Sequence, residues 1–384
     1  MGKKIPKAIC LYGAQFMRQQ VQSLQTQFDG VQTGKDIEYV HQMRVASRRL
    51  HNGLDLFKEC LPDKKSKVWL ENIRNITHAL GDARDMDIQI EELPRLYEAD
   101  LDPVFKPGYT RLLLRLKQNR TKAQKKINKT LFKLQESQTL EAMLVRFDKM
   151  LENHADDYLF TPALYEKSCS TITENLTVFL SYQDYIHDPE MADKLHAMRI
   201  AGKHLRYTME VFAPIYNSAL NPFIAVMKDI QDQLGEIHDN DVWVAWLPKF
   251  ILQEQARIED YFGNAEPLQK LLPGLHHLME DRQQARDETY HTFLALWDSI
   301  NAENVWSELK KLIHAPLDLK PLAPQDADPP TEDFEITQAN SLEGAESDAA
   351  EEEAEMDIDD FDEIIDVEIK DLPPDPDPPS TKPQ

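Results

Sequence analysis

The hydrophobic positions of residues 41–57 lie on one side of an α-helix when about 100° is allowed for each residue. This apolar stripe consists of Met43, Ala46, Leu50, Leu54 and Phe57. The opposite side carries His41, Arg44, Arg48 and His51, with Arg49 on its flank. Such a division predicts an amphipathic helix that packs by one side and presents cations on the other.

The same pattern recurs 155 residues further along the chain, at residues 195–206. The cationic side of this second helix consists of His196, Arg199, Lys203 and Arg206, with His204 on its flank. Its apolar side consists of Met198, Ala201, Leu205, Met209 and Phe212. The apolar sides thus end on a phenylalanine at the same distance, and the repeat predicts two matching basic helices.

Neither basic stretch contains an acidic residue, since residues 41–54 and 196–208 lack Asp and Glu. A basic stripe opposite an apolar one is usually a solvated face with ion pairs inside the helix. Unpaired like charges four residues apart destabilise a helix by a few tenths of a kcal/mol each. Both copies carry that penalty with the same residue types, which favours an anion site with two basic walls over the solvated face.

A second repeated block occupies residues 80–87 and 234–241, which are 154 residues apart. Its shared positions are the glycines Gly81 and Gly235 and the aspartates Asp85 and Asp239. We expect the glycines to be helix C-caps and the aspartates to be N-caps or first-turn acids of the next helix. The residues leading into the block match as well, and they place Arg74 opposite Lys228.

The doublet of His238 and Asp239 has a second interpretation, because a His-Asp pair in a helical protein can belong to a metal-dependent phosphohydrolase. In the first half, Arg84 stands at the position of His238. Arginine is not a metal ligand, so the internal copy argues against a metal site. The sequence also has no glycine-rich phosphate loop, cysteine cluster or nucleophile elbow, and we expect no catalysis, no metal and no cofactor.

Four further segments are predicted to be helices. The first helix of each half is expected at 8–29 and 163–185, with Pro162 at a first-turn position that tolerates proline. A long basic helix at 111–135 carries Lys122 and Lys125, and its expected counterpart at 276–297 carries Arg282 and Arg286. The dense charge of 111–135 is partly a solvated face, but these cations could add to the anion site.

The net charge of −24 is concentrated at one end of the chain. Residues 324–384 contain 22 acidic residues and two basic ones, whereas the preceding residues are nearly balanced. A segment rich in Pro, Asp and Glu and poor in aromatic residues is expected to be disordered. It could confer solubility, compete with phosphate for the basic site, or recruit a partner through Phe334, Phe361, Ile364 and Ile365.

The remaining composition predicts a soluble cytoplasmic protein. No window of 18 apolar residues occurs, and polar residues interrupt the segment after the basic start, which argues against a membrane helix or a signal peptide. The cysteines, Cys10, Cys60 and Cys169, are odd in number and widely spaced. They are therefore interpreted as reduced thiols rather than a disulfide framework.

The two linked motifs, His41-x-x-Arg44-x-x-x-Arg48-Arg49-Leu50 and Leu80-Gly81-x-x-Arg84-Asp85-x-Asp87, and their counterparts in the second half resemble the CHAD domain, the conserved-histidine α-helical domain. The resemblance covers about residues 8–315. It implies an all-α fold of two four-helix bundles, related by internal duplication about a pseudo-twofold axis, at 8–158 and 159–315, followed by the disordered acidic tail at 324–384. It also implies binding of inorganic polyphosphate in a central basic groove. Together with the absence of catalytic motifs and of a long apolar window, this predicts a non-catalytic protein with no membrane partner, which could associate with polyphosphate granules.

Combining the repeat with this resemblance gives a set of candidate polyphosphate ligands. They are His41, Arg44, Arg48, Arg49, His51, Arg74, Lys122, Lys125, His196, Arg199, Lys203, His204, Arg206, Lys228, Arg282 and Arg286. His51 and His204 depart from the basic residues usual at their positions, and histidine is mostly uncharged at neutral pH. The alternatives are a nucleic-acid binder that uses the same cations, although only Tyr207 offers a ring for base stacking there, and a polyphosphate hydrolase.

Overall fold

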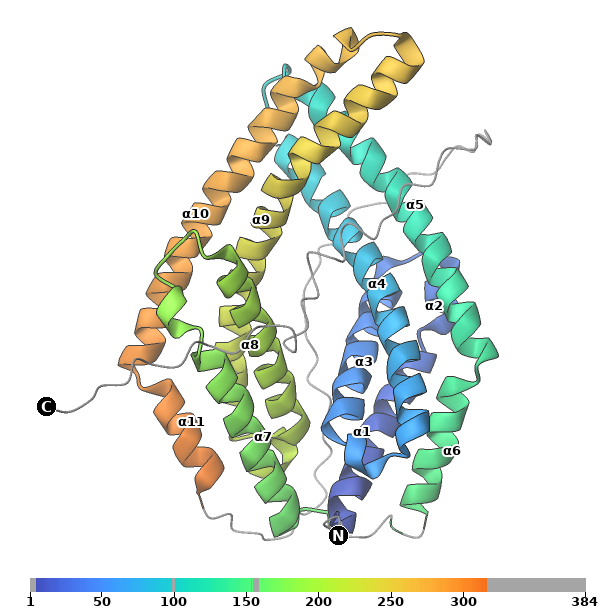
Figure 1. Ribbon diagram of the computed structural model, residues 1–384, viewed down its shortest axis with the longest axis vertical. Coiled ribbons are helices and arrows are strands. Elements are labelled where there is room, and N and C mark those ends of the chain that lie inside the picture. Colours follow the sequence, from blue (N-terminus) through green and yellow to red (C-terminus); the bar gives the residue numbers. More distant parts are fainter. Residues whose placement is uncertain (1–4, 99–100, 153, 155–158, 316–384) are drawn as a thin grey trace, which may run out of the picture. The chain divides into compact units, whose positions relative to one another are not determined.

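A computed structural model describes residues 5–98, 101–152, 154 and 159–315, and within these residues every regular element is a helix (Figure 1). The first half contains α1 (Lys7–Gln25), α2 (Phe28–Thr33), α3 (Ile37–Leu56), the 3-10 helix η1 (Lys58–Cys60), α4 (Asp63–Glu98), α5 (Lys106–Glu136) and α6 (Thr139–Leu151). The second half contains α7 (Pro162–Leu180), η2 (Gln183–Tyr185), α8 (Ala192–Phe212), η3 (Ala213–Tyr216), α9 (Asn221–Phe262), η4 (Glu266–Lys270), α10 (Leu272–Ala302) and α11 (Val305–His314). The predicted all-α fold is confirmed, and the acidic segment 324–384 lies outside the described residues.

The order of packing is the same in the two halves. In the first, α3 packs between α1 and α4, α4 packs on α5, and α6 returns to α1. In the second, α8 packs between α7 and α9, α9 packs on α10, and α11 returns to α7. Each half is thus a bundle of four helical positions, of which the last is shared by two consecutive helices, α5 and α6 in the first half and α10 and α11 in the second. The duplication itself stays a prediction from the sequence.

The apolar stripes read from the sequence form the interior of the two bundles. Met43, Leu50 and Phe57 on the first stripe are fully buried, and so are Met198 and Phe212 on the second. Burial of such side chains contributes about 1.5–3 kcal/mol each and orients the two helices. The polar sides of α3 and α8 are consequently fixed in direction by packing.

The helix starts follow local capping rules. The Asp36 carboxylate accepts a hydrogen bond of 2.8 Å from the backbone N–H of Glu38, at the start of α3. The Thr161 hydroxyl accepts one from the N–H of Leu164, and Pro162 occupies the first turn of α7 as predicted. These caps satisfy backbone donors that a helix leaves without internal partners.

Both glycine caps were predicted wrongly. Gly81 lies inside α4 and Gly235 inside α9, and Asp85 and Asp239 are therefore mid-helix residues rather than caps. A glycine inside a helix costs about 0.5–1 kcal/mol relative to alanine. Buried side chains on both sides of each glycine, Leu80 and Ala83 in α4 and Leu234 and Ile237 in α9, outweigh that penalty.

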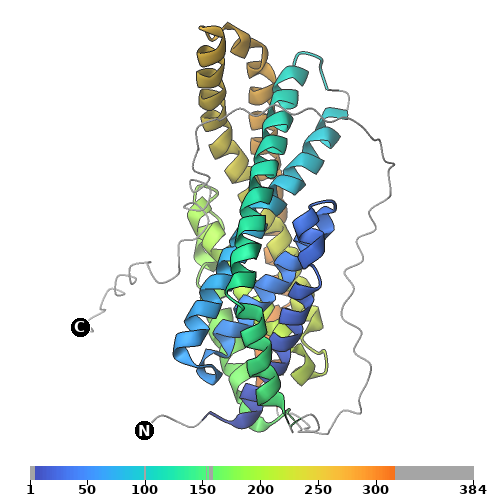
Figure 2. The ribbon, with the colours of Figure 1, turned by 90° about the vertical axis from the view of Figure 1, so that its right-hand side faces the viewer.

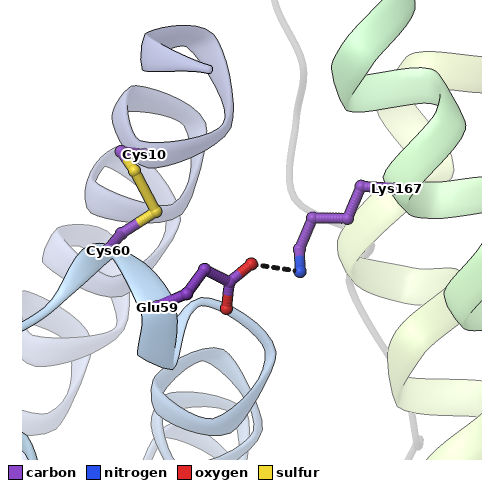
Figure 3. The surroundings of a disulfide bond; sticks show 4 residues. All are labelled: Cys10, Glu59, Cys60 and Lys167. Carbon is purple, nitrogen blue, oxygen red and sulfur yellow. Dashed lines mark hydrogen bonds and ion pairs between the residues drawn. A yellow bond between two sulfur atoms is a disulfide. The ribbon is translucent and has the colours of Figure 1, made fainter. Parts of the chain in front are cut away.

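The cysteines were also predicted wrongly, because Cys10 and Cys60 form a disulfide and Cys169 is free (Figure 3). The two sulfurs belong to α1 and η1, and their residues are 50 positions apart with Cα atoms at 5.3 Å. Only the folded packing of α1 on η1 brings them together, so spacing could not reveal the pair. Next to the disulfide, Glu59 accepts a 2.5 Å hydrogen bond from Lys167 of α7 (Figure 3).

The two halves meet where α1 and the C-terminal end of α3 contact the C-terminal end of α8. The rings of Phe57 and Phe212 pack edge to face with their centroids 6.1 Å apart. The Tyr12 hydroxyl donates a 2.6 Å hydrogen bond to the Val211 carbonyl oxygen. We call these four residues the seam, and they attach the C-terminal part of α8 to the first bundle.

A second connection between the halves lies along the long helices α4, α5, α9 and α10, which extend beyond the other helices (Figures 1 and 2). Here α5 crosses α10 at Gly108 and Gly274, where an added Cβ on Gly274 would lie 2.0 Å from the Phe105 carbonyl oxygen. The absence of side chains therefore permits this crossing. A separate apolar core joins α4, α5, α9 and α10 at this level, including Leu93, Leu112, Trp243, Leu247 and Leu275.

Candidate anion-binding site

The cations predicted on α3 and α8 face one another across the two halves. We call this set the basic face, and it comprises His41, Arg44, Arg48, Arg49, His51, His196, Arg199, Lys203, His204 and Arg206. Burial, and then the charges of Arg44, Arg206 and Arg199, lower the pKa of Arg48. Arg48 of α3 thus lies close enough to Arg199 and Arg206 of α8 for their charges to affect its pKa. The fold therefore brings the basic helices of both halves together.

Lys203 shows the same crowding from the side of α8. Burial lowers its pKa well below the ordinary value, and Arg199, Arg48 and Arg44 lower it further. Like charges held this close repel one another in the free protein. A bound polyanion would remove that repulsion, so the arrangement favours negatively charged ligands.

Two arginines of the basic face lie over the glycines of the second repeated block. A Cβ built on Gly81 would lie 3.6 Å from Nε of Arg44, and one on Gly235 would lie 3.9 Å from Nε of Arg199. The glycines in the middle of α4 and α9 therefore leave room for guanidinium groups that come from α3 and α8. This is a role for the second motif that the sequence did not reveal.

Three arginines of the basic face have a buried N–H donor that no described residue accepts. The Nε atoms of Arg44, Arg199 and Arg206 are buried, and none has a hydrogen-bond partner among the described residues. A buried donor without an acceptor costs about 1–3 kcal/mol. An anionic oxygen placed against these groups would supply the missing acceptors.

Carboxylates at the edge of the basic face were not predicted. Asp85 of α4 lies 3.9 Å from Arg44. Burial, and then Arg44, lower the pKa of Arg199, while Asp239 and Asp85 oppose that shift. Asp85 thus lies near both arginines and Asp239 near Arg199, where each carboxylate would compete with an external anion.

Glu210 and Tyr207 of α8 organise the arginines nearest the seam. The Glu210 carboxylate lies 3.8 Å from Arg49 and 3.4 Å from Arg206. The guanidinium carbons of Arg48 and Arg206 lie 4.9 and 5.0 Å from the centre of the Tyr207 ring. Cation–π contacts of this kind stabilise by about 0.5–2 kcal/mol, and they hold cations from both halves at one aromatic ring.

Two groups of histidines belong to the site. Burial lowers the pKa of His51, and His204, Arg74 and His78 lower it further, while Asp55 raises it. In the second half, Nδ1 of His196 lies 3.1 Å from Nδ1 of His238, and the ring centroids are 4.2 Å apart. His238 was considered in the sequence only as a metal ligand, and its contact with the basic face could not be read from spacing.

The family model of the CHAD domain matches residues 15–248 of this chain, which is more than half of it. The chain belongs to the CHAD domain family. The crystal structure of the CHAD domain from the plant Ricinus communis matches with a TM-score of 0.52 at 18% identity, over 83% of this chain and 95% of that one. The structure of PptA from Streptomyces chartreusis matches with a TM-score of 0.49 at 14% identity, over 76% of this chain and 99% of that one. No curated protein matches, and at such identities the first likeness shows the fold alone.

The remaining predicted ligands of this CHAD domain lie on α4, α5, α9 and α10 rather than on α3 and α8. Lys122 and Lys125 are exposed on α5, which packs mainly on α4 and α10. Lys228 is half-buried on α9, seven residues before Gly235, and Arg74 is exposed on α4, seven residues before Gly81. Their part in binding stays a prediction from the sequence.

Arg282 and Arg286 of the CHAD domain are buried in ion pairs. Arg282 donates to Glu92 at 2.5 Å and to Asp281 at 2.6 Å. Arg286 donates to Asp241 at 3.1 Å and to the Pro189 carbonyl oxygen at 2.6 Å. Because carboxylates and a carbonyl already accept from these guanidinium groups, we leave both arginines out of the site proposed below.

Other features of the CHAD domain lie elsewhere or are absent from the described part. Within residues 5–98, 101–152, 154 and 159–315, no group of three or more His, Cys, Asp or Glu side chains could hold a metal ion. In the same ranges no helix is long and apolar enough to cross a membrane. A cavity of about 530 Å³ lies on α7 and α11, lined by Tyr165, Cys169 and Ile313 among others, and none of the basic face lines it.

Proposed function

We propose that this CHAD protein binds inorganic polyphosphate without catalysis, in a groove along the basic face of α3 and α8. The observation that carries the proposal is the matching pair of arginines, Arg44 and Arg199. Each lies over a glycine of a neighbouring helix and keeps a buried Nε donor that has no partner within the part of the chain that the structure describes. Membership of the CHAD family supports the choice of polyphosphate among polyanions.

The chemistry of the side chains fits a chain of phosphates. Arginine can donate two parallel hydrogen bonds to phosphoryl oxygens, and lysine acts as a compact point charge. Burial is the main cause of the lowered pKa values of Arg48, Arg199 and Lys203, and neighbouring cations lower them further. A row of negative charges would relieve the repulsion among these cations. A flexible polymer can follow such cations without any readout of sequence.

The contacts of Tyr207 disfavour nucleic acid as the ligand. Binding of single strands depends on aromatic rings that stack on bases. Tyr207 already holds the guanidinium groups of Arg48 and Arg206 within 5.0 Å of its ring centre. The basic face therefore offers charges for phosphates and no free ring from this residue for bases.

The cellular setting is part of the proposal. We place the protein in the cytoplasm, at the surface of polyphosphate granules. The disulfide between Cys10 and Cys60 is of a kind more frequent in oxidising compartments. Cysteine usage therefore no longer supports the cytoplasmic assignment, which depends on the ligand alone.

A titration of the full chain with long-chain polyphosphate tests the function. RNA and single-stranded DNA of equal charge serve as competitors, and released phosphate is measured with and without divalent metal. We expect tight binding to polyphosphate, weaker binding to nucleic acid and no release of phosphate. By analogy with nucleic acids, each phosphate contact contributes about −0.7 to −0.9 to the slope of log affinity against log salt. Affinity that does not respond to salt, or equal affinity for RNA, contradicts the proposal.

A further inference from the structure

The contact between His196 and His238 limits the charge that the two imidazoles can carry. Their Nδ1 atoms lie 3.1 Å apart, so one must donate and the other must accept. An imidazolium has a proton on both nitrogens and is a donor at each. The contact therefore requires that at least one of the two rings is neutral.

The surroundings of His238 keep it in the neutral form. Burial lowers its pKa far below that of a free imidazole, and the charges of Arg199, His196 and Lys203 on α8 lower it further. On its own helix the adjacent residue is Asp239, whose pKa is raised by burial and further by Asp85 and Glu92 of α4. On α10, which packs on α9, Arg286 is paired with Asp241, three residues after His238.

The first half of the chain shows that a cation can occupy this position. Arg84 stands in the first repeat where His238 stands in the second. The helix α4 that carries Arg84 also supplies Gly81 under Arg44, just as α9 supplies Gly235 under Arg199. By the sequence repeat, an arginine and a titratable histidine thus occupy corresponding positions in the two halves.

We propose that His238 is a proton-dependent phosphate ligand: when polyphosphate binds, the contact with His196 opens, the pair takes up a proton, and both imidazoles donate to phosphate oxygens. This inference rests on the function proposed above. It assigns one further binding residue and makes the affinity depend on pH. The first half contributes a permanent charge at this point, and the second contributes a charge that appears only with the ligand.

The direction of the effect follows from linkage. A polyanion stabilises the charged form of His238 and raises its pKa in the complex, so binding consumes protons from solvent. Affinity then increases as pH falls through the pKa of the complex, and it levels off below the pKa of the free protein. Uptake of roughly one proton corresponds to about a tenfold gain in affinity for each pH unit.

Calorimetric titration of the full chain with long-chain polyphosphate measures this uptake. The titration is repeated near neutral pH in two buffers that differ in ionisation enthalpy, because the difference in measured heat gives the number of protons bound. We expect uptake of roughly one proton and at least a tenfold rise in affinity between about pH 8 and pH 6. Equal heats in the two buffers, or affinity independent of pH, overturn the inference.

Three variants identify the group that takes up the proton. His238→Arg copies the first half, and it should remove most of the uptake and raise affinity at the higher pH. His238→Gln keeps a polar side chain that cannot be charged, so it should lose the uptake while affinity stays near the wild-type value at the higher pH. Asp239→Asn is the matched control, because this neighbouring acid also lies near Arg199, and it should leave the uptake unchanged.

The outcomes separate this inference from the proposed function. If wild-type protein does not bind polyphosphate at any pH, the function itself fails. If it binds but both His238 variants keep the wild-type uptake, the function stands and the role of His238 is refuted. Loss of uptake in Asp239→Asn alone assigns the proton to the carboxylate and also refutes the inference. A thermal melt of each variant verifies that it is folded, and the two His238 variants provide independent readings.

Discussion

Arginine is used in two opposite ways in this CHAD domain. On the basic face, Arg44 and Arg199 have buried Nε atoms with no hydrogen-bond partner among the described residues, and the Asp85 carboxylate beside Arg44 is exposed. Along the long helices, Arg115 donates at 2.6 Å to Glu254, whose side chain is fully buried, and Arg111 and Arg257 lie within 3.4 Å of the same carboxylate. The residue type is the same in both regions, and the partner decides whether it is available to a ligand.

This difference separates affinity from stability. Glu254 of α9 holds two arginines of α5, so its carboxylate joins the two halves of the molecule. Among the residues that the structure describes, no ion pair joins Arg44 or Arg199 to a fully buried carboxylate. Changes in the first region should therefore affect unfolding, and changes in the second should affect binding.

Glu254→Gln is expected to have the largest effect on stability. Removing a buried carboxylate leaves its arginines without compensation, and losses of about 3–5 kcal/mol in the free energy of unfolding are typical. Denaturant unfolding of the full chain measures it. Affinity for polyphosphate should change by less than about twofold, and a large loss of affinity would show that the two regions are not separate.

Arg44→Glu and Arg199→Glu should show the converse behaviour. Each removes a charge-assisted donor and adds a repelling carboxylate, so affinity should fall by about a hundredfold, or about 3 kcal/mol. Each variant should stay folded, with its helical circular dichroism unchanged, because neither side chain belongs to an apolar core. Lys129→Glu on the exposed surface of α5 is the matched control for net charge. If it weakens binding as strongly, the ligand is held by general charge.

Asp85→Asn and Asp239→Asn should tighten binding slightly. Each substitution removes a carboxylate that competes for Arg44 or Arg199, and solvent screens exposed pairs of this kind to at most about 1 kcal/mol. A gain of about two- to fivefold is therefore expected in a polyphosphate titration at low salt. Weaker binding would mean that orientation of the arginines by these acids matters more than competition.

The smallest expected effect comes from the glycines beneath the arginines. A Cβ on Gly81 would lie in ordinary contact with Arg44, at 3.6 Å from Nε. Gly81→Ala should therefore stabilise α4 by about 0.5–1 kcal/mol without loss of affinity. Gly81→Leu should displace the guanidinium group and weaken binding. Equal affinity of the two variants would show that the position of Arg44 does not depend on the glycine.

Period and repetition were sufficient to predict the basic helices. The stripes of α3 and α8 follow from the helical period, and Met43, Leu50, Met198 and Phe212 are buried where that period places them. The residues that face away from those stripes, such as Arg48, are brought together because packing fixes the direction of both helices. Helix type and the basic face are therefore local properties of the sequence.

Properties that depend on distant partners were not predictable in the same way. Glycine and aspartate at 81 and 85 have the residue types of a helix end, and only tertiary packing of α4 shows that the helix continues. Arg282 has the charge of a phosphate ligand, but Glu92, 190 residues away in the sequence, already accepts from it. The pairing of Cys10 with Cys60 belongs to the same class of long-range contact.

The seam gives the halves a relationship resembling that of subunits. Phe57 and Phe212 occupy corresponding positions of the repeat, and they pack against each other. In a symmetric dimer, an isologous interface brings a residue against its own copy in the same way. Either half expressed alone would therefore present a large aromatic side chain that lacks its partner. We expect such a fragment to associate with itself through that surface, so that the covalent link between the halves replaces a concentration-dependent contact with a permanent one.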